Sequence, residues 1–342
     1  MTFLYIVIGL VLIFDFINGF HDSANSIATV VSTKVLSPFA AVAMAAFFNF
    51  MAFLIFPLKV ASTMSYGVVN PTIINLTVIS SAIAAAIIWN LATWWLGLPS
   101  SSSHTLVGGL VGAAVACAGW SSVIVSGVLW IVIFIVVAPL LGMVMSFIIS
   151  AIVIFLAKNH SPSGIDKHFR RLQLLSAAAF SLGHGGNDAQ KTMGIIAILL
   201  FSVAGTNEFV STYLYQPGIG FHVPLWITIT CYSVIALGTL TGGWKVIKTL
   251  GDGLAKLKPV QGFCAETAGA LTLIGTAVSG IPVSTTHTIT GAIIGVGMTK
   301  GMASVKWATA KNIVSAWILT IPSTLVISGL IYLLISSFLN LS

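Results

Sequence analysis

Two aspartates, Asp22 and Asp188, lie within long apolar stretches of this sequence. An ionisable side chain at the centre of a membrane helix costs roughly 2.5–3.5 kcal/mol on insertion scales, so such residues usually serve a function. If these stretches are helical, each aspartate shares one helix face with polar residues three or four positions away. These are Asn18 and Asn25 beside Asp22, and His184 and Lys191 beside Asp188. The alternative interpretation is a structural network that only holds helices together.

Two runs of hydroxyl side chains form a second pair of motifs, which read PSSSSH at 99–104 and PVSTTH at 282–287. A serine or threonine before a helix caps its N-terminus, and the free N–H groups of the first turn attract anions together with the helix dipole. Two such N-termini that face each other would bind a tetrahedral oxyanion. For His104 and His287, a hydrogen bond to the loop backbone and a contact with the ligand are both open. The candidate anion ligands are Ser101, Ser102, Ser103, Ser284, Thr285 and Thr286.

Carboxylates beside an anion repel it unless cations or protons occupy the same site. A cation between an aspartate and the anion turns this repulsion into attraction, so each ligand raises the affinity of the other. Hard cations such as Na⁺ prefer oxygen ligands, but the residue types do not distinguish Na⁺ from H⁺. The candidate ligands of this coupling cation are Asn18, Asp22, Asn25, Asn187, Asp188 and Glu266.

The motifs divide the chain into two related halves. Asp22 aligns with Asp188 at an offset of 166 residues, and the hydroxyl motifs align at an offset of 183. Repeats in membrane transporters are commonly inverted and hold the substrate between them near the midplane. We expect a first repeat at 1–157, a cytoplasmic basic linker at 158–171 and a second repeat at 172–342. The larger offset also aligns Gly108 with Gly291, Gly112 with Gly295, and Pro139 with Pro322.

Two charged residues break this repeat. Glu266 lies in an apolar stretch, and its counterpart in the first half is Ile83. We interpret Glu266 as a ligand of the coupling cation, with a structural role as the alternative. Lys191 takes the place of Asn25, and it would either pair with Asp188 or contact the anion.

The composition is that of a membrane protein. Of 342 residues, 57% are hydrophobic and only 6% are charged, whereas soluble domains carry about 25% charged residues. Several apolar stretches are as long as the roughly 20 residues that a helix needs to cross the bilayer core. The predicted fold is therefore an all-α polytopic membrane protein.

The first half shows how the crossings are arranged. Long apolar segments near 2–34, 37–58 and 70–97 predict three crossings. Residues 121–157, with a central proline, would form either two helices or one strongly kinked helix. Residues 103–119 are only about 25 Å long as a helix, so we expect them to be re-entrant or broken. Each of two inverted-topology repeats thus has about five membrane crossings plus one short re-entrant or broken helix.

The basic residues indicate how the chain lies in the membrane. The net charge is +7, and four basic residues lie in 158–171 and four in 245–258. By the positive-inside rule, loops 158–171 and 244–260 face the cytoplasm, and loop 203–222, without Lys or Arg, faces the other side. We therefore expect a multi-pass protein of the inner cell membrane. This grouping of charge next to apolar segments does not suggest a nucleic-acid partner.

The paired motifs resemble the signature of the inorganic phosphate transporter (PiT) family, with NGFHDSAN at 18–25, GGND at 185–188, and the hydroxyl motifs at 99–104 and 282–287. The resemblance implies uptake of phosphate with Na⁺ or H⁺ by inverted repeats, no other cofactor, and often a homodimer. Lys191 replaces the asparagine of more symmetric members. The resemblance places phosphate and its coupling ions among Asp22, Asn25, Asp188, Ser101–Ser103 and Ser284–Thr286, with Lys191 as a further candidate ligand and Glu266 as a matching family acid.

Three other functions are weighed against phosphate transport. Sulfate is the alternative substrate, although a carboxylate can accept a hydrogen bond from protonated phosphate, whose second pKa is about 6, and sulfate has no such proton. An intramembrane hydrolase would need one serine held by a histidine base, and duplicated hydroxyl runs do not suggest a single nucleophile. We therefore expect a protein that is not an enzyme. A passive anion channel is the third alternative.

Overall fold

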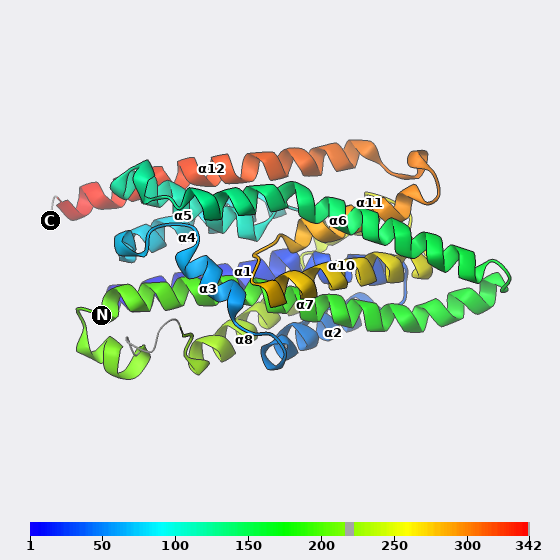
Figure 1. Ribbon diagram of the computed structural model, residues 1–342, viewed down its shortest axis with the longest axis horizontal. Coiled ribbons are helices and arrows are strands. Elements are labelled where there is room, and N and C mark those ends of the chain that lie inside the picture. The colour runs from blue at the N-terminus through cyan, green and yellow to red at the C-terminus, as the bar shows by residue number, and fades with distance from the viewer. Residues whose placement is uncertain (216–221, 341–342) are drawn as a thin grey trace.

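The computed structural model describes residues 1–215 and 222–340, and within these ranges every regular element is a helix (Figure 1). The first half contains α1 (Thr2–Ser32), α2 (Pro38–Met51), α3 (Lys59–Tyr66), α4 (Leu76–Trp95), α5 (Ser102–Ala118) and α6 (Val125–Ala157). The second half contains α7 (Pro162–Ala204), α8 (Leu225–Thr241), α9 (Trp244–Gly251), α10 (Pro259–Ser279), α11 (Thr285–Met298) and α12 (Trp307–Asn340). Four of these described helices are long and apolar enough to cross a membrane, or six spans if each bent pair counts as one. The predicted all-helical membrane fold is confirmed.

The two halves follow the same order of elements. A bent pair follows the first helix of each half, with a bend of 83° between α2 and α3 and of 73° between α8 and α9. Isolated β-bridges join equivalent loops, Val69 with Val123 and Ala255 with Val305. In Figure 1, α1 and α7 run in opposite directions, and so do α6 and α12. This arrangement agrees with the predicted inverted repeats.

The halves interlock through their short helices. Helix α5 packs along α12, and α11 packs along α6. Glycines allow this close approach: a Cβ atom on Gly112 would lie 2.1 Å from the Leu325 carbonyl oxygen, and one on Gly295 would lie 2.2 Å from that of Met143. Small residues are what close helix packing in membranes requires. Each half therefore completes its packing with a helix of the other half.

Within the predicted segment 121–157, residues Val125–Ala157 form a single long helix, α6, and not two helices. Pro139 lies inside it and cannot donate a hydrogen bond to the Ile135 carbonyl, four residues earlier. The His287 ring on α11 compensates, because its Nδ1 lies 3.3 Å from that oxygen. Helix α12 likewise continues through Pro322. Each half therefore has three long helices, one bent helix pair and one short helix, which is α5 in the first half and α11 in the second.

Two predicted cytoplasmic loops are largely helical. Helix α7 begins at Pro162, because the Ser161 side chain accepts a hydrogen bond from the Gly164 amide at 3.3 Å and proline suits the first helical position. The predicted linker at 158–171 is thus mostly the start of α7. Similarly, α9 occupies the first part of the predicted loop at 244–260. Of the third predicted loop, 203–222, residues 216–221 lie outside the described residues.

The glycine contacts predict a measurable loss of stability. Gly112→Ala and Gly295→Ala should each lower the free energy of unfolding by about 1–3 kcal/mol, because the added methyl group meets backbone of the facing helix. Denaturant unfolding of the purified protein in detergent would measure this. Gly275→Ala is the matched control, since a Cβ there meets nothing within 4 Å. Equal stability of all three variants would show that the halves do not approach as described.

Candidate functional site

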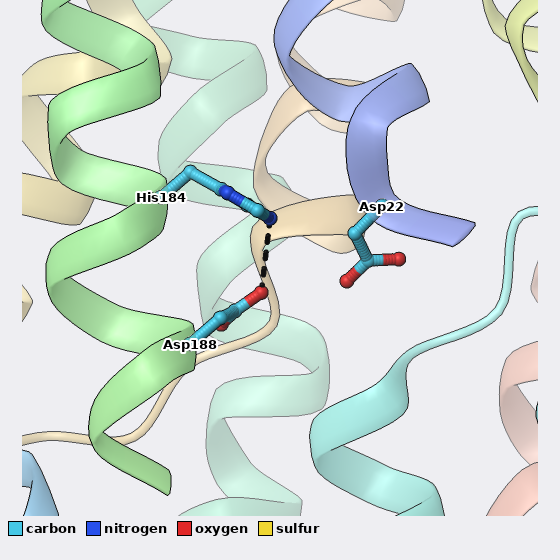
Figure 2. A group of neighbouring side chains, drawn as sticks. All are labelled: Asp22, His184 and Asp188. Atoms are coloured by element: carbon cyan, nitrogen blue, oxygen red, sulfur yellow. Dashed lines mark ion pairs between the residues drawn. The ribbon is translucent and has the colours of Figure 1, made fainter. Parts of the chain in front are cut away.

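The two aspartates meet at one buried point between the halves. Ligand atoms of Asp22 on α1 and of His184 and Asp188 on α7 all lie within 4.8 Å of one another. Figure 2 shows the Asp22 carboxylate facing His184 and Asp188 from the opposite helix. All three residues are at most 1% exposed. The two copies of the aspartate motif thus form one shared site.

The first-half aspartate is held by its own short helix and by a histidine. Asp22 Oδ2 lies 2.8 Å from the Ser102 hydroxyl at the start of α5, and that hydroxyl also lies 2.5 Å from Asn18 Oδ1. The other carboxylate oxygen lies 2.9 Å from His21 Nδ1. Because Ser102 has one proton for two acceptors, it cannot satisfy both oxygens at once. This leaves oxygen lone pairs at the site that a cation can use.

The second-half aspartate has an equivalent partner and an additional charge. Asp188 Oδ2 accepts a hydrogen bond from the Thr285 hydroxyl at 3.1 Å, and Thr285 corresponds to Ser102 at the 183-residue offset. The same oxygen lies 3.2 Å from His184 Nε2. Asp188 Oδ1 pairs with the Lys191 ammonium group one turn further along α7. Asp188 therefore has a fixed positive partner.

Residues one turn after each aspartate reach across to the other half. The Asn25 amide donates to the Thr285 and Thr286 hydroxyls at 3.2 and 2.9 Å. At the equivalent position, Lys191 donates to the Ser103 hydroxyl of α5. Each hydroxyl run therefore interacts with both halves.

The short helices begin at this site. Ser101 and Ser284 cap α5 and α11, since their hydroxyl oxygens accept hydrogen bonds from the amides of His104 at 3.3 Å and His287 at 3.2 Å. The N-termini of α5 and α11 therefore lie at the position that the predicted anion site requires. The two histidine rings lie next to each other, with centroids 4.7 Å apart. The His287 ring contacts backbone, but its partner is the Ile135 carbonyl oxygen within α6 and not the predicted loop backbone.

Glu266 lies in a separate polar cluster. Its carboxylate accepts hydrogen bonds from Thr29 at 2.5 Å, Gln173 at 3.0 Å and Ser176 at 2.5 Å. Thr29 follows Asp22 by seven residues, so the cluster lies about two turns, or roughly 10 Å, further along α1. The structure therefore does not bring Glu266 into contact with the aspartate pair.

Asn187 also lies apart from the carboxylates. Its amide donates to the carbonyl oxygens of Gly183 at 3.1 Å and Leu273 at 2.8 Å, which ties α7 to α10. Its side-chain oxygen is buried and has no hydrogen-bond partner among the described residues. Of the predicted cation ligands, only Asn18, Asp22, Asn25 and Asp188 share one network.

The structure adds two histidines at the aspartate pair, and one more buried acid about two turns away from it. His21 and His184 each contact an aspartate, and the spacing of four residues between His184 and Asp188 is the signal that points to this contact. Asp15 is a further buried acid on α1, and its Oδ1 accepts a hydrogen bond from Thr192 at 2.8 Å. No repeat signal marks Asp15, because Ser181 stands at its counterpart.

The known proteins that resemble this chain are named as phosphate transporters. A relative from Rhizobium meliloti (strain 1021), named probable low-affinity inorganic phosphate transporter, is 53% identical over 326 residues, which cover 95% of this chain and 94% of the relative. A relative of the same name from Bacillus subtilis (strain 168) is 40% identical and covers 98% of this chain and 97% of its own length.

A solved structure and a family signature extend this result. The structure named "The sodium-dependent phosphate transporter" superimposes with a TM-score of 0.84 at 26% identity and covers 98% of this chain and 99% of that one. The sequence matches the phosphate transporter family over residues 18–328, a range that includes every residue of the site described above except Asp15. This chain therefore belongs to the phosphate transporter family.

Proposed function

We propose that this chain binds inorganic phosphate between its two halves and carries it across the membrane together with a coupling cation. The observation that carries the proposal is the meeting of Asp22 and Asp188 with the N-termini of α5 and α11 at one buried point. Hydroxyls and free N–H groups at two helix N-termini supply donors for a tetrahedral anion. The names of the relatives support inorganic phosphate as that anion.

The proposed transport works by alternating access, and the burial of the site supports this part of the proposal. The proposed phosphate ligands are at most 6% exposed, a value reached only by Ser103. A solute reaches such a site only when the halves move relative to each other, as inverted-repeat transporters do. The interlocked short helices carry half of the site each, so their movement would open it to one side at a time.

The coupling cation makes the two carboxylates compatible with an anion. Asp22, with Asn18 and Asn25, offers oxygen ligands next to the hydroxyl runs. Glu266, about two turns further along, would bind the cation on its way to or from this site. The superimposed structure is named as sodium-dependent, which supports Na⁺ as this cation, and H⁺ is the alternative.

We further propose that the end of the molecule with the basic residues faces the cytoplasm. Arg170 near the start of α7 donates to the Lys34 carbonyl oxygen at the end of α1, so these basic segments lie at one end. The exposed apolar surfaces of α6 and α12 would then face lipid, or a second copy in a homodimer, in the cell membrane.

Neutralising either aspartate should strongly reduce transport. Asp22→Asn and Asp188→Asn should each lower the initial rate of phosphate uptake into proteoliposomes by about 10- to 100-fold, the equivalent of the roughly 1.5–3 kcal/mol of a charge-assisted hydrogen bond. Uptake would be driven by Na⁺ and pH gradients imposed separately. Asp252→Asn, at an exposed position, is the control. Near-normal uptake by both site variants would contradict the proposal.

Sulfate should compete poorly. A large excess of sulfate is expected to leave uptake of labelled phosphate nearly unchanged, because Asp22 and Asp188 can accept a hydrogen bond only from a protonated anion. Strong inhibition by sulfate would support the sulfate carrier instead. Accumulation of phosphate against its gradient would exclude a passive channel.

The orientation can be tested by labelling. In a Cys117→Ser background, a membrane-impermeant thiol reagent should label Lys158→Cys only from the cytoplasmic side and Thr206→Cys only from the outside. Both positions are exposed, and the two remaining native cysteines are buried. The reverse pattern would invert the proposed orientation.

A further inference from the structure

The repeat places a charged side chain where its partner half has a neutral one. Lys191 and Asn25 are related by the same 166-residue offset that relates Asp188 and Asp22. We propose that the Lys191 ammonium group is a tethered cation that takes the place of one coupling ion at Asp188. Transport by this chain then uses one cation fewer per phosphate than a site with two asparagines. This inference rests on the cation-coupled function proposed above.

The contacts of Lys191 are those of a bound ion. Its ammonium group carries three protons, and the structure gives it three acceptors: Asp188 Oδ1, the Ser103 hydroxyl, and the Val283 carbonyl oxygen at 2.8 Å. These acceptors come from three different segments, as in a coordination shell. The side chain is 2% exposed. With each proton engaged, the ammonium group has no donor left for phosphate in this conformation.

A second cation would be repelled from this position. A Na⁺ ion close enough to bind Asp188 Oδ1 would lie within a few ångströms of the ammonium charge in a buried site, where such repulsion is strong. The carboxylate charge is also already neutralised by Lys191. The second half therefore offers no attraction for a mobile cation.

The first half keeps the features of a mobile cation site. The Asn25 amide nitrogen is used by the two hydroxyls of α11, but its side-chain oxygen is buried and has no hydrogen-bond partner among the described residues. Asn18 Oδ1 and the Asp22 carboxylate lie nearby, joined by Ser102. No lysine or arginine forms an ion pair with Asp22 in the described structure. One mobile cation therefore binds at Asp22.

Replacing the tethered charge should create a second site. Lys191→Asn would copy the first half, and in the presence of phosphate the variant should bind one more Na⁺ per protein than the original chain. Equilibrium binding of ²²Na⁺ to purified protein, with inorganic phosphate at saturation, measures this directly. The ratio of ²²Na⁺ to ³²P-phosphate entering proteoliposomes should rise by one in parallel.

Further variants protect the test from a simple loss of folding. Lys191→Gln, also neutral, should give the same extra Na⁺ if Lys191→Asn does not fold. The double variant Asp188→Asn/Lys191→Asn removes the carboxylate as well, so it should bind no more Na⁺ than the original chain. An unchanged Na⁺ count in both single variants, or an extra Na⁺ in the double variant, would overturn the inference. Absence of phosphate uptake by the original chain would instead reject the proposed function.

Discussion

A buried carboxylate in an apolar protein core requires a hydrogen-bond donor or a positive charge close to it, and this constraint shapes the centre of the molecule. Asp22 and Asp188 lie where two helices from opposite halves come closest to two helix N-termini. Hydroxyls of α5 and α11 satisfy part of each carboxylate, and histidines contact both. The site therefore forms only where these four elements converge.

Much of this site follows from the sequence, because the duplicated motifs name both the acids and the hydroxyls that meet them. The partners that lie far away in the sequence cannot be predicted from these motifs. Asn187 is one of the predicted cation ligands, yet its amide donates to the carbonyl oxygen of Leu273, which is 86 residues away in the sequence. The Ile135 carbonyl oxygen, which loses its helical donor at Pro139, lies 3.3 Å from the ring of His287, 152 residues further along the chain. A local pattern predicts a break at a proline, but it does not reveal a distant side chain that meets the freed carbonyl oxygen.

The departures from symmetry are as informative as the repeat. Two identical halves would give two identical cation sites and no distinction between the sides of the membrane. Here Lys191 changes one of the central sites, while Asp15 and Glu266 place acids about two turns from the centre towards opposite ends of α1. The central site therefore repeats the same elements from both halves, and its charges differ only where the two copies differ.

The crossed packing of the short helices has a consequence for biosynthesis. Helix α6 is synthesised before α11. The backbone of α6 that the glycines of α11 contact, and the Ile135 carbonyl oxygen, therefore lack these partners until more than a hundred further residues have been made. Helix α5 waits even longer for α12, the final helix described. A chain interrupted in its second half would leave the surfaces of α5 and α6 uncovered in the bilayer. Quality-control proteases and other incomplete chains could then contact these surfaces.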